Sequence, residues 1–186
     1  YASPTLNDDS TKVNQFGAYA SLVVKNVNGF NVELGGRYNN FNKYGDVFTF
    51  SFNPYYDLKN NFKIFGNISS GFKTPSLYQV YSEYRSPAGE LSPEKSLSIE
   101  GGVQYFTDKV SLQAVYFSRS IQDNIVFVNT NTSPYGYYAN ADKQKDKGLE
   151  FEASIDFGKV QLNANYTNLD GKIETKAGAK DTSFFN

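Results

Sequence analysis

Two clusters of tyrosine are the residues in this chain whose types and spacing could bind a ligand. One irregular stretch holds Tyr78, Tyr81, Tyr84 and Arg85, and a second holds Tyr135, Tyr137 and Tyr138. Tyrosine rings give broad amphipathic contact at a low entropic cost, and a guanidinium can grip a carboxylate or phosphate. We interpret both clusters as parts of a ligand-binding platform. The alternative is that the rings pack against one another and stiffen the loops.

The residues that most enzymes use for covalent or acid–base chemistry are missing. Histidine and cysteine are both absent, which removes Ser-His-Asp and Cys-His arrangements together with imidazole and thiolate metal sites. The formal net charge is −1 and the basic residues are scattered, so no basic stripe is available for nucleic acid. We therefore expect no enzyme, no cofactor, no metal site and no nucleic-acid partner.

About eight segments alternate apolar and polar residues with the period of a β-strand. They lie at 15–24, 30–39, 47–58, 62–72, 96–105, 110–119, 149–157 and 160–167. All of the aromatic content, 17% of the chain, is Tyr and Phe, which favours strands over helices. The sequence predicts an all-β fold of antiparallel strands joined as consecutive hairpins.

One face of each predicted strand lacks Asp, Glu, Lys and Arg. The charged residues of the other face are Glu33, Arg37, Lys63, Glu100, Arg119, Glu150, Glu152 and Asp156. A soluble sandwich would show similar alternation, but a membrane barrel requires an uncharged face toward lipid. The outer, lipid-facing residues should include Phe50, Leu97, Leu112, Phe151 and Leu162.

Short turns and long connections alternate along the chain. The turns are predicted at 26–29, 59–61, 107–109 and 158–159, and the long connections at 39–46, 73–93, 120–139 and from 168 onward. Outer-membrane barrels have this asymmetry, with short periplasmic turns and long external loops. The sequence therefore predicts a segment of a transmembrane β-barrel whose tyrosine clusters lie in external loops.

The best acidic cluster lies on one predicted strand. Glu150, Glu152 and Asp156 occupy positions i, i+2 and i+6, which share one face of a strand. A cation or substrate site is one interpretation. Ordinary lining of a water-filled lumen is the interpretation that we favour.

A resemblance to a known family is carried by residues 71–106. The run GFKTPSLYQVYSEY, followed by ELSPEKSLSIEGGVQYF, resembles the part of TonB-dependent outer-membrane receptors where an aromatic-Lys/Arg-x-Pro strand end enters an external loop that closes on Leu-x-Pro-Glu-x-Ser. The flanking runs QFGAYASL and NADKQKDKGLEFEASIDF are similar to neighbouring strands of that family. The resemblance covers nearly the whole chain.

This resemblance implies a receptor in the bacterial outer membrane that captures a scarce nutrient and is opened by TonB through a plug domain. The chain contains nothing that resembles the plug, the TonB-contacting box or the aromatic C-terminal strand, so we expect residues 1–186 to be a fragment of a single barrel domain. The implied partners are outer-membrane lipid and a small-molecule nutrient, either cobalamin or a siderophore. The resemblance favours cobalamin.

Two other classes of protein remain open. A complete eight-stranded barrel with a structural or adhesive role is one, since eight strands can close a small barrel. Its lumen would be filled by side chains that pair with one another, rather than by Asn, Ser and Gln. The other class is a soluble β-sandwich binding module, which would be monodisperse without detergent.

Several local features give further expectations. Pro54 cannot donate to a ladder, which predicts a bulge or kink. Gly101-Gly102 within a strand predicts close packing or curvature. Residues 125–129 lie within a predicted long connection but could extend a strand beyond the bilayer, and the mixed-charge run 142–148 should be a solvated loop edge.

Overall fold

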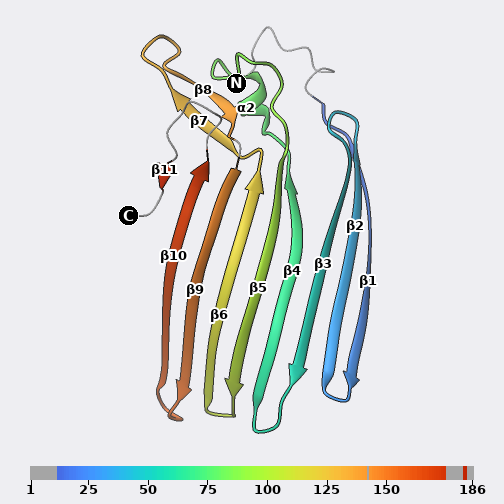
Figure 1. Ribbon diagram of the computed structural model, residues 1–186, viewed down its shortest axis with the longest axis vertical. Coiled ribbons are helices and arrows are strands. Elements are labelled where there is room, and N and C mark those ends of the chain that lie inside the picture. The colour runs from blue at the N-terminus through green and yellow to red at the C-terminus, as the bar shows by residue number, and fades with distance from the viewer. Residues whose placement is uncertain (1–11, 142, 175–181, 184–186) are drawn as a thin grey trace.

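The computed structural model describes residues 12–141, 143–174 and 182–183, in which the chain forms one long antiparallel sheet (Figure 1). Its strands, in spatial order, are β1 (Gln15–Val27), β2 (Phe30–Phe41), β3 (Gly45–Asp57), β4 (Phe62–Lys73), β5 (Glu94–Phe106), β6 (Val110–Gln122), β9 (Lys143–Asp156), β10 (Gln161–Glu174) and β11 (Thr182–Ser183). A separate two-stranded sheet pairs β7 (Ile125–Asn129) with β8 (Gly136–Asn140). The predicted all-β class is confirmed.

The long strands exceed what a membrane requires. Those from β1 to β6, together with β9 and β10, contain between 12 and 14 residues. A tilted strand needs only about 9–11 residues to cross the hydrocarbon core. The sheet therefore continues beyond the lipid, and Figure 1 shows that the larger loops gather at one end of it while the opposite end carries short turns.

The predicted short turns are confirmed, and their backbone explains them. Asn28 and Gly29 have φ of 53° and 87°, which fits the type I′ turn that matches the twist of a hairpin. Asn60 and Asn61 also have positive φ, at 63° and 65°. The predicted long connection at 39–46 is wrong, because β2 continues to Phe41 and β3 begins at Gly45.

Pro54 causes no bulge, which was one of the two alternatives predicted at this position, the other being a kink. Val32 lies opposite Pro54 in an unbroken register between β2 and β3. Between β3 and β4 the same register holds on both sides of the proline, with Phe52 opposite Ile68 and Tyr55 opposite Phe65. Because proline has no backbone N–H, the pairing of β3 with β4 is interrupted at Asn53 and Pro54. Neither strand carries an extra residue there.

Two further expectations are wrong. The charged run is not a loop, because β9 begins at Lys143 and pairs with β6 from that residue onward. Residues 125–129 do not extend a barrel strand, since β7 forms its own hairpin with β8. In both places the alternation of apolar and polar residues is weak, because beyond the lipid neither face of a strand has to be apolar.

The charge-free face is exposed, as predicted. The exposed fractions of Phe50, Leu97, Leu112, Phe151 and Leu162 run from 40% to 56%. Among the described residues the buried apolar side chains are only Phe41, Leu91, Val115, Ala141 and Ile173, so no closed core covers this face. The described sheet is also open, because β1 pairs with β2 alone and not with β10. Neither a β-sandwich nor a closed eight-stranded barrel has this arrangement.

The two adjacent glycines of β5 differ in their surroundings. A Cβ on Gly102 would lie 2.6 Å from the Phe65 ring and 2.7 Å from the Ala114 carbonyl oxygen, whereas nothing lies within 4 Å of one on Gly101. We expect Gly102→Val to destabilise the barrel by about 1–3 kcal/mol through overpacking, and Gly101→Val to be tolerated. Urea unfolding of the two variants in detergent measures the difference. Equal stability of the two would contradict the packing role of Gly102.

Candidate ligand-binding site at the loop end of the sheet

The first tyrosine-rich stretch contains one turn of helix, α2 (Leu77–Tyr81). The Ser76 hydroxyl accepts a hydrogen bond from the Gln79 N–H, and the Gln79 side chain accepts one from the Ser76 N–H, which forms a capping box. This capping box stabilises a helical turn in a stretch that the sequence pattern predicted to be an irregular loop. In the described part of the chain, no helix is long and apolar enough to cross a membrane.

Three of the predicted tyrosines meet in one aromatic cluster. The ring centroids of Tyr78 and Tyr84 are 6.3 Å apart, and those of Tyr78 and Tyr138 are also 6.3 Å apart. Phe127 of β7 joins them, at 5.6 Å from Tyr84 and 5.2 Å from Tyr138. Such edge-on and tilted pairs add roughly 0.5–1.5 kcal/mol each beyond area burial. The two predicted tyrosine clusters thus belong partly to one packed unit, and Phe127 was missed by sequence reasoning.

Hydrogen bonds fix the β7–β8 hairpin to the α2 loop. The Tyr138 N–H donates to the Tyr84 carbonyl at 2.8 Å. The Asn140 side chain accepts from the Ser92 N–H at 2.8 Å and donates to the Ser92 carbonyl at 2.9 Å. Because three separate bonds join residues far apart in sequence, the two loops behave as one body.

Glu94, the glutamate of the Leu-x-Pro-Glu-x-Ser stretch, joins three strand ends by hydrogen bonds. Its buried carboxylate accepts from Lys73 Nζ at 3.1 Å and from the Ile125 N–H at 2.9 Å. A charged group can be buried in this way only if it is paired. This glutamate therefore ties the end of β4 and the start of β7 to the start of β5.

Tyr81 lies apart from the aromatic cluster, beside a cation that the sequence did not single out. Lys43, in the connection between β2 and β3, donates from Nζ to the Tyr81 hydroxyl at 2.8 Å. The two residues line a hollow of about 300 Å³ together with Arg85 and Glu90. The hydrogen bond with Tyr81 raises the pKa of Lys43 above its ordinary value of 10.5, so this cation stays charged at any physiological pH.

The other two tyrosines of the second stretch are not brought into the cluster. Tyr135 is 68% exposed at the tip of the β7–β8 hairpin. Tyr137 is half-buried and, as the neighbour of Tyr138 in β8, points to the opposite side of that strand. The structure assigns them no shared site.

The predicted carboxylates line the polar face of β9. Glu152 borders a polar hollow of about 370 Å³ with Gln104, Gln113, Asn163 and Asn165. Asp156 instead accepts the Gly158 N–H at the turn. No group of three or more His, Cys, Asp or Glu that could hold a metal occurs among the described residues. Glu152 and Asp156 therefore have different surroundings, a polar hollow and a turn.

Sequence reasoning missed an ion pair above these carboxylates. Arg119 Nε donates to Asp146 at 2.9 Å, and Gln144 donates to both oxygens of the same carboxylate at 3.0 Å. Asp146 is 5% exposed. Arg119 was placed on the lumen face correctly, but its partner lay in the run interpreted as loop.

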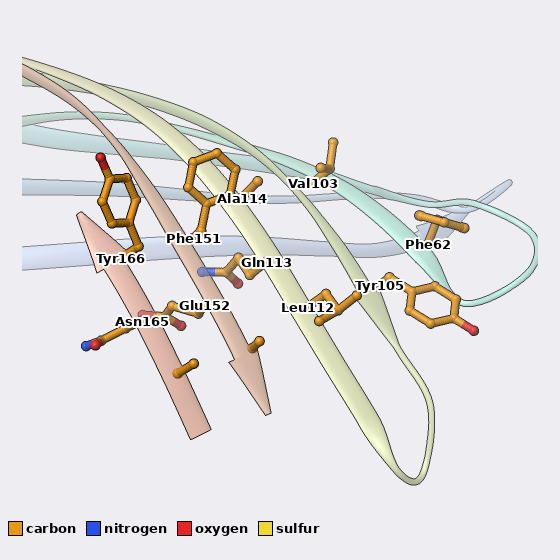
Figure 2. A pocket seen from close by; sticks show the side chains of 12 residues that line it. Phe62, Val103, Tyr105, Leu112, Gln113, Ala114, Phe151, Glu152, Asn165 and Tyr166 are labelled. Atoms are coloured by element: carbon orange, nitrogen blue, oxygen red, sulfur yellow. The ribbon is translucent and has the colours of Figure 1, made fainter. Parts of the chain in front are cut away.

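An apolar hollow of about 470 Å³ lies on the charge-free face (Figure 2). Small side chains at Ala114, Ala153 and Ala164 leave space between large rings. Figure 2 shows the rings of Phe151 and Tyr166 side by side there, with centroids 6.3 Å apart. The residues that line this hollow come from the strands and not from the α2 loop or the β7–β8 hairpin, so the hollow is separate from the loop site.

The chain forms a sheet of long antiparallel hairpins that has an apolar outer face, a polar inner face and large loops at one end. These features are typical of an outer-membrane β-barrel, of which this chain forms a part. Residues 1–186 match the family described as TonB dependent receptor-like, beta-barrel. The chain belongs to that family.

Individual relatives agree with the family assignment. The chain is 24% identical to the probable TonB-dependent siderophore receptor PirA of Acinetobacter baumannii, over 87% of this chain and 26% of the relative. The solved PirA structure from that organism superposes with a TM-score of 0.69 at 20% identity, covering 92% of this chain and 32% of that one. The copper transporter OprC gives a TM-score of 0.73 at 18% identity, over 88% of this chain and 29% of that one.

A third solved structure is the ferric enterobactin receptor of Pseudomonas aeruginosa in complex with enterobactin, with a TM-score of 0.69 at 18% identity over 89% and 31% of the two chains. These structural likenesses show the fold. The chain spans about a quarter to a third of the length of the relatives it matches. Members of this family are receptors of the bacterial outer membrane, which is where this chain lies.

Proposed function

We propose that this chain is part of a TonB-dependent receptor that binds an anionic metal chelate, of the iron–siderophore class, at its external loops. The observation that carries the proposal is the packed unit of α2 and the β7–β8 hairpin, which presents tyrosine rings beside two cations. Tyr78 remains 58% exposed at the edge of the aromatic cluster. Lys43 and Arg85 line the adjoining hollow.

The chemistry of this surface suits an oxygen-rich, negatively charged ligand. Ammonium and guanidinium groups attract carboxylate or catecholate oxygens, and exposed phenol rings offer stacking area. The names of the relatives point in the same direction, toward siderophore and metal transport. None of these observations favours cobalamin, the other nutrient that the resemblance implied.

We further infer that residues 1–186 form one portion of a single barrel domain. The open described sheet and the share of each relative that the chain covers support this inference. TonB would then act through a plug domain outside this portion, and the portion itself would bind and admit a nutrient without catalysing a reaction.

Uptake measurements on the full-length receptor test the substrate class. Cells that carry it as their only receptor of this kind are given radiolabelled ferric siderophores, carrying catecholate, hydroxamate or carboxylate groups, or labelled cobalamin. We expect saturable binding and TonB-dependent uptake of at least one ferric siderophore, and neither for cobalamin. Uptake of cobalamin alone would overturn the siderophore assignment, and binding without any dependence on TonB would overturn the transport role.

A further inference from the structure

The β7–β8 hairpin carries two rings of the aromatic cluster, Phe127 and Tyr138, but it is not part of the long sheet. Among the described strands, β7 and β8 pair only with each other, whereas the long strands are fixed by pairing with their neighbours. Ladder hydrogen bonds therefore do not set the direction of the hairpin. Its position depends on the bonds at its base and on its contacts with the α2 loop.

Two side chains hold the base of the hairpin. Ile125, the first residue of β7, donates its N–H to Glu94 at 2.9 Å. Asn140, the last residue of β8, donates to the Asp123 carbonyl at 2.6 Å and is bonded twice to the Ser92 backbone. Ile125 and Asn140 lie opposite each other in the register, so both attachments act on the same end of the hairpin.

The attachment through Glu94 is the stronger one. A hydrogen bond from an N–H to a carboxylate is roughly twice as strong as a bond between neutral groups. Lys73 Nζ lies 3.2 and 3.1 Å from the two carboxylate oxygens, and Lys73 pairs with Glu94 in the register of β4 with β5. The Glu94 side chain is only 10% exposed. Because a buried carboxylate needs such partners, Ile125 is held to a fixed point of the long sheet.

The position of Ile125 determines where the rings of the hairpin lie. Phe127 is two residues further along β7, so it shares a face with Ile125 at about 7 Å along the strand. The Phe127 ring contacts Tyr84 and Tyr138. Glu94 is not among the residues that line the hollow beside Tyr81. Any influence of Glu94 on a ligand there must act through the hairpin.

We propose, on the basis of the nutrient site proposed above, that Glu94 is a positioning residue of that site. Its hydrogen bond to the Ile125 N–H holds the β7–β8 hairpin against the α2 loop, and this contact sets the affinity for the nutrient. A direct contact of Glu94 with the ligand does not fit the structure, because the carboxylate is buried and would repel an anionic chelate.

Two substitutions in the full-length receptor test this role. Glu94→Leu has a similar size but no acceptor for the Ile125 N–H, whereas Glu94→Gln keeps an oxygen there. Lys73 is 63% exposed, so water can replace its lost partner in both variants. In Glu94→Leu, we expect ferric siderophore to bind about fivefold or more weakly, and Glu94→Gln should restore most of the parent's affinity. Equilibrium binding to intact cells measures both.

Hydrogen–deuterium exchange of the ligand-free receptor provides a second readout. The Tyr138 N–H donates to the Tyr84 carbonyl, so its exchange rate reports whether the hairpin is docked, at a distance from Glu94. This amide should exchange about tenfold faster in Glu94→Leu and nearly as slowly as the parent in Glu94→Gln. Mass spectrometry with fragmentation to single residues measures the rate. If the parent bound no siderophore, the proposed function would fail, yet this exchange rate would still decide the role of Glu94.

Asp146→Leu is the matched control. It also removes a buried carboxylate, whose side chain is 5% exposed and whose partner Arg119 is half-exposed, but Asp146 makes no hydrogen bond to Ile125. The control should keep the parent's affinity and Tyr138 exchange rate, with a urea midpoint of the barrel lowered at least as much as in Glu94→Leu. Equal effects of the two leucine variants would overturn the proposal, as would unchanged Tyr138 exchange in a heat-modifiable Glu94→Leu barrel. Equal losses in Glu94→Gln and Glu94→Leu would also overturn it, because the charge and not the bond to Ile125 would then be required.

Discussion

The substitution Leu112→Arg should prevent stable insertion of the barrel. Leu112 lies on the outward face of β6 in a row with Tyr105 and Ala153, and its side chain is 43% exposed to the medium on that face. An arginine near the bilayer midplane of such a barrel costs about 2–4 kcal/mol. The expected result is a receptor that fails to become heat-modifiable when it is refolded into liposomes.

The neighbouring residue provides the control for this prediction. Gln113 lines the polar hollow on the opposite face, so Gln113→Arg introduces the same charge one residue away into water. That variant should insert like the parent. If both variants inserted equally well, the outward face would not contact lipid, and the orientation of the whole sheet would be wrong.

Simultaneous replacement of Tyr78, Tyr81, Tyr84 and Arg85 by alanine should weaken ligand binding by tenfold or more. A loss of this size means that the four side chains together contribute ~1–3 kcal/mol to the binding free energy, as clustered tyrosines and arginines commonly do at binding surfaces. Two effects combine, because the change removes contact area and also the ring contacts that hold Phe127 and Tyr138 in place. Equilibrium binding of the ferric siderophore to intact cells measures the loss.

A second variant separates the charge from the ring packing. Lys43→Gln with Arg85→Gln leaves the aromatic cluster intact, yet removes both cations from the hollow beside Tyr81. A loss of affinity in this variant that grows as salt is lowered would identify the charges as ligand contacts. Unchanged affinity in a normally folded fourfold alanine variant would contradict the loop site and return these tyrosines to a structural role. The search would then move to Tyr135, Tyr137 and Tyr138.

The sequence was sufficient to predict structure wherever that structure depends on neighbouring residues in the chain. Alternation with a period of two predicted all eight long strands and, within the predicted ranges, the face that each residue occupies, because lipid on one side and water on the other impose opposite demands on successive side chains. Asn28-Gly29 predicted a tight hairpin, since both positions must adopt positive φ. These signals need no knowledge of distant residues.

The sequence was insufficient to predict the strands where the sheet extends beyond the lipid. From Lys143 to Gly148 both faces of β9 are polar, so the alternation weakens and the strand was interpreted as loop. The ion pair of the buried Asp146 with the half-exposed Arg119 was therefore missed. The outward direction of Lys143, Lys145 and Lys147 was missed as well, because it is defined only by the register of β9 with β6 and β10. A strand without a hydrophobic period is recognised by its pairing partners.

For the candidate site too, the sequence determined one part and the tertiary structure the other. Its residue types were visible in the sequence, because six tyrosines and an arginine in two irregular stretches are an unusual concentration of contact chemistry. Which of them meet was decided by the tertiary structure, since Tyr84 contacts Tyr138 by a backbone hydrogen bond and Ser92 binds the Asn140 side chain across 48 positions of the chain. No periodic pattern encodes such contacts, because they depend on how two loops pack after the strands beneath them have paired.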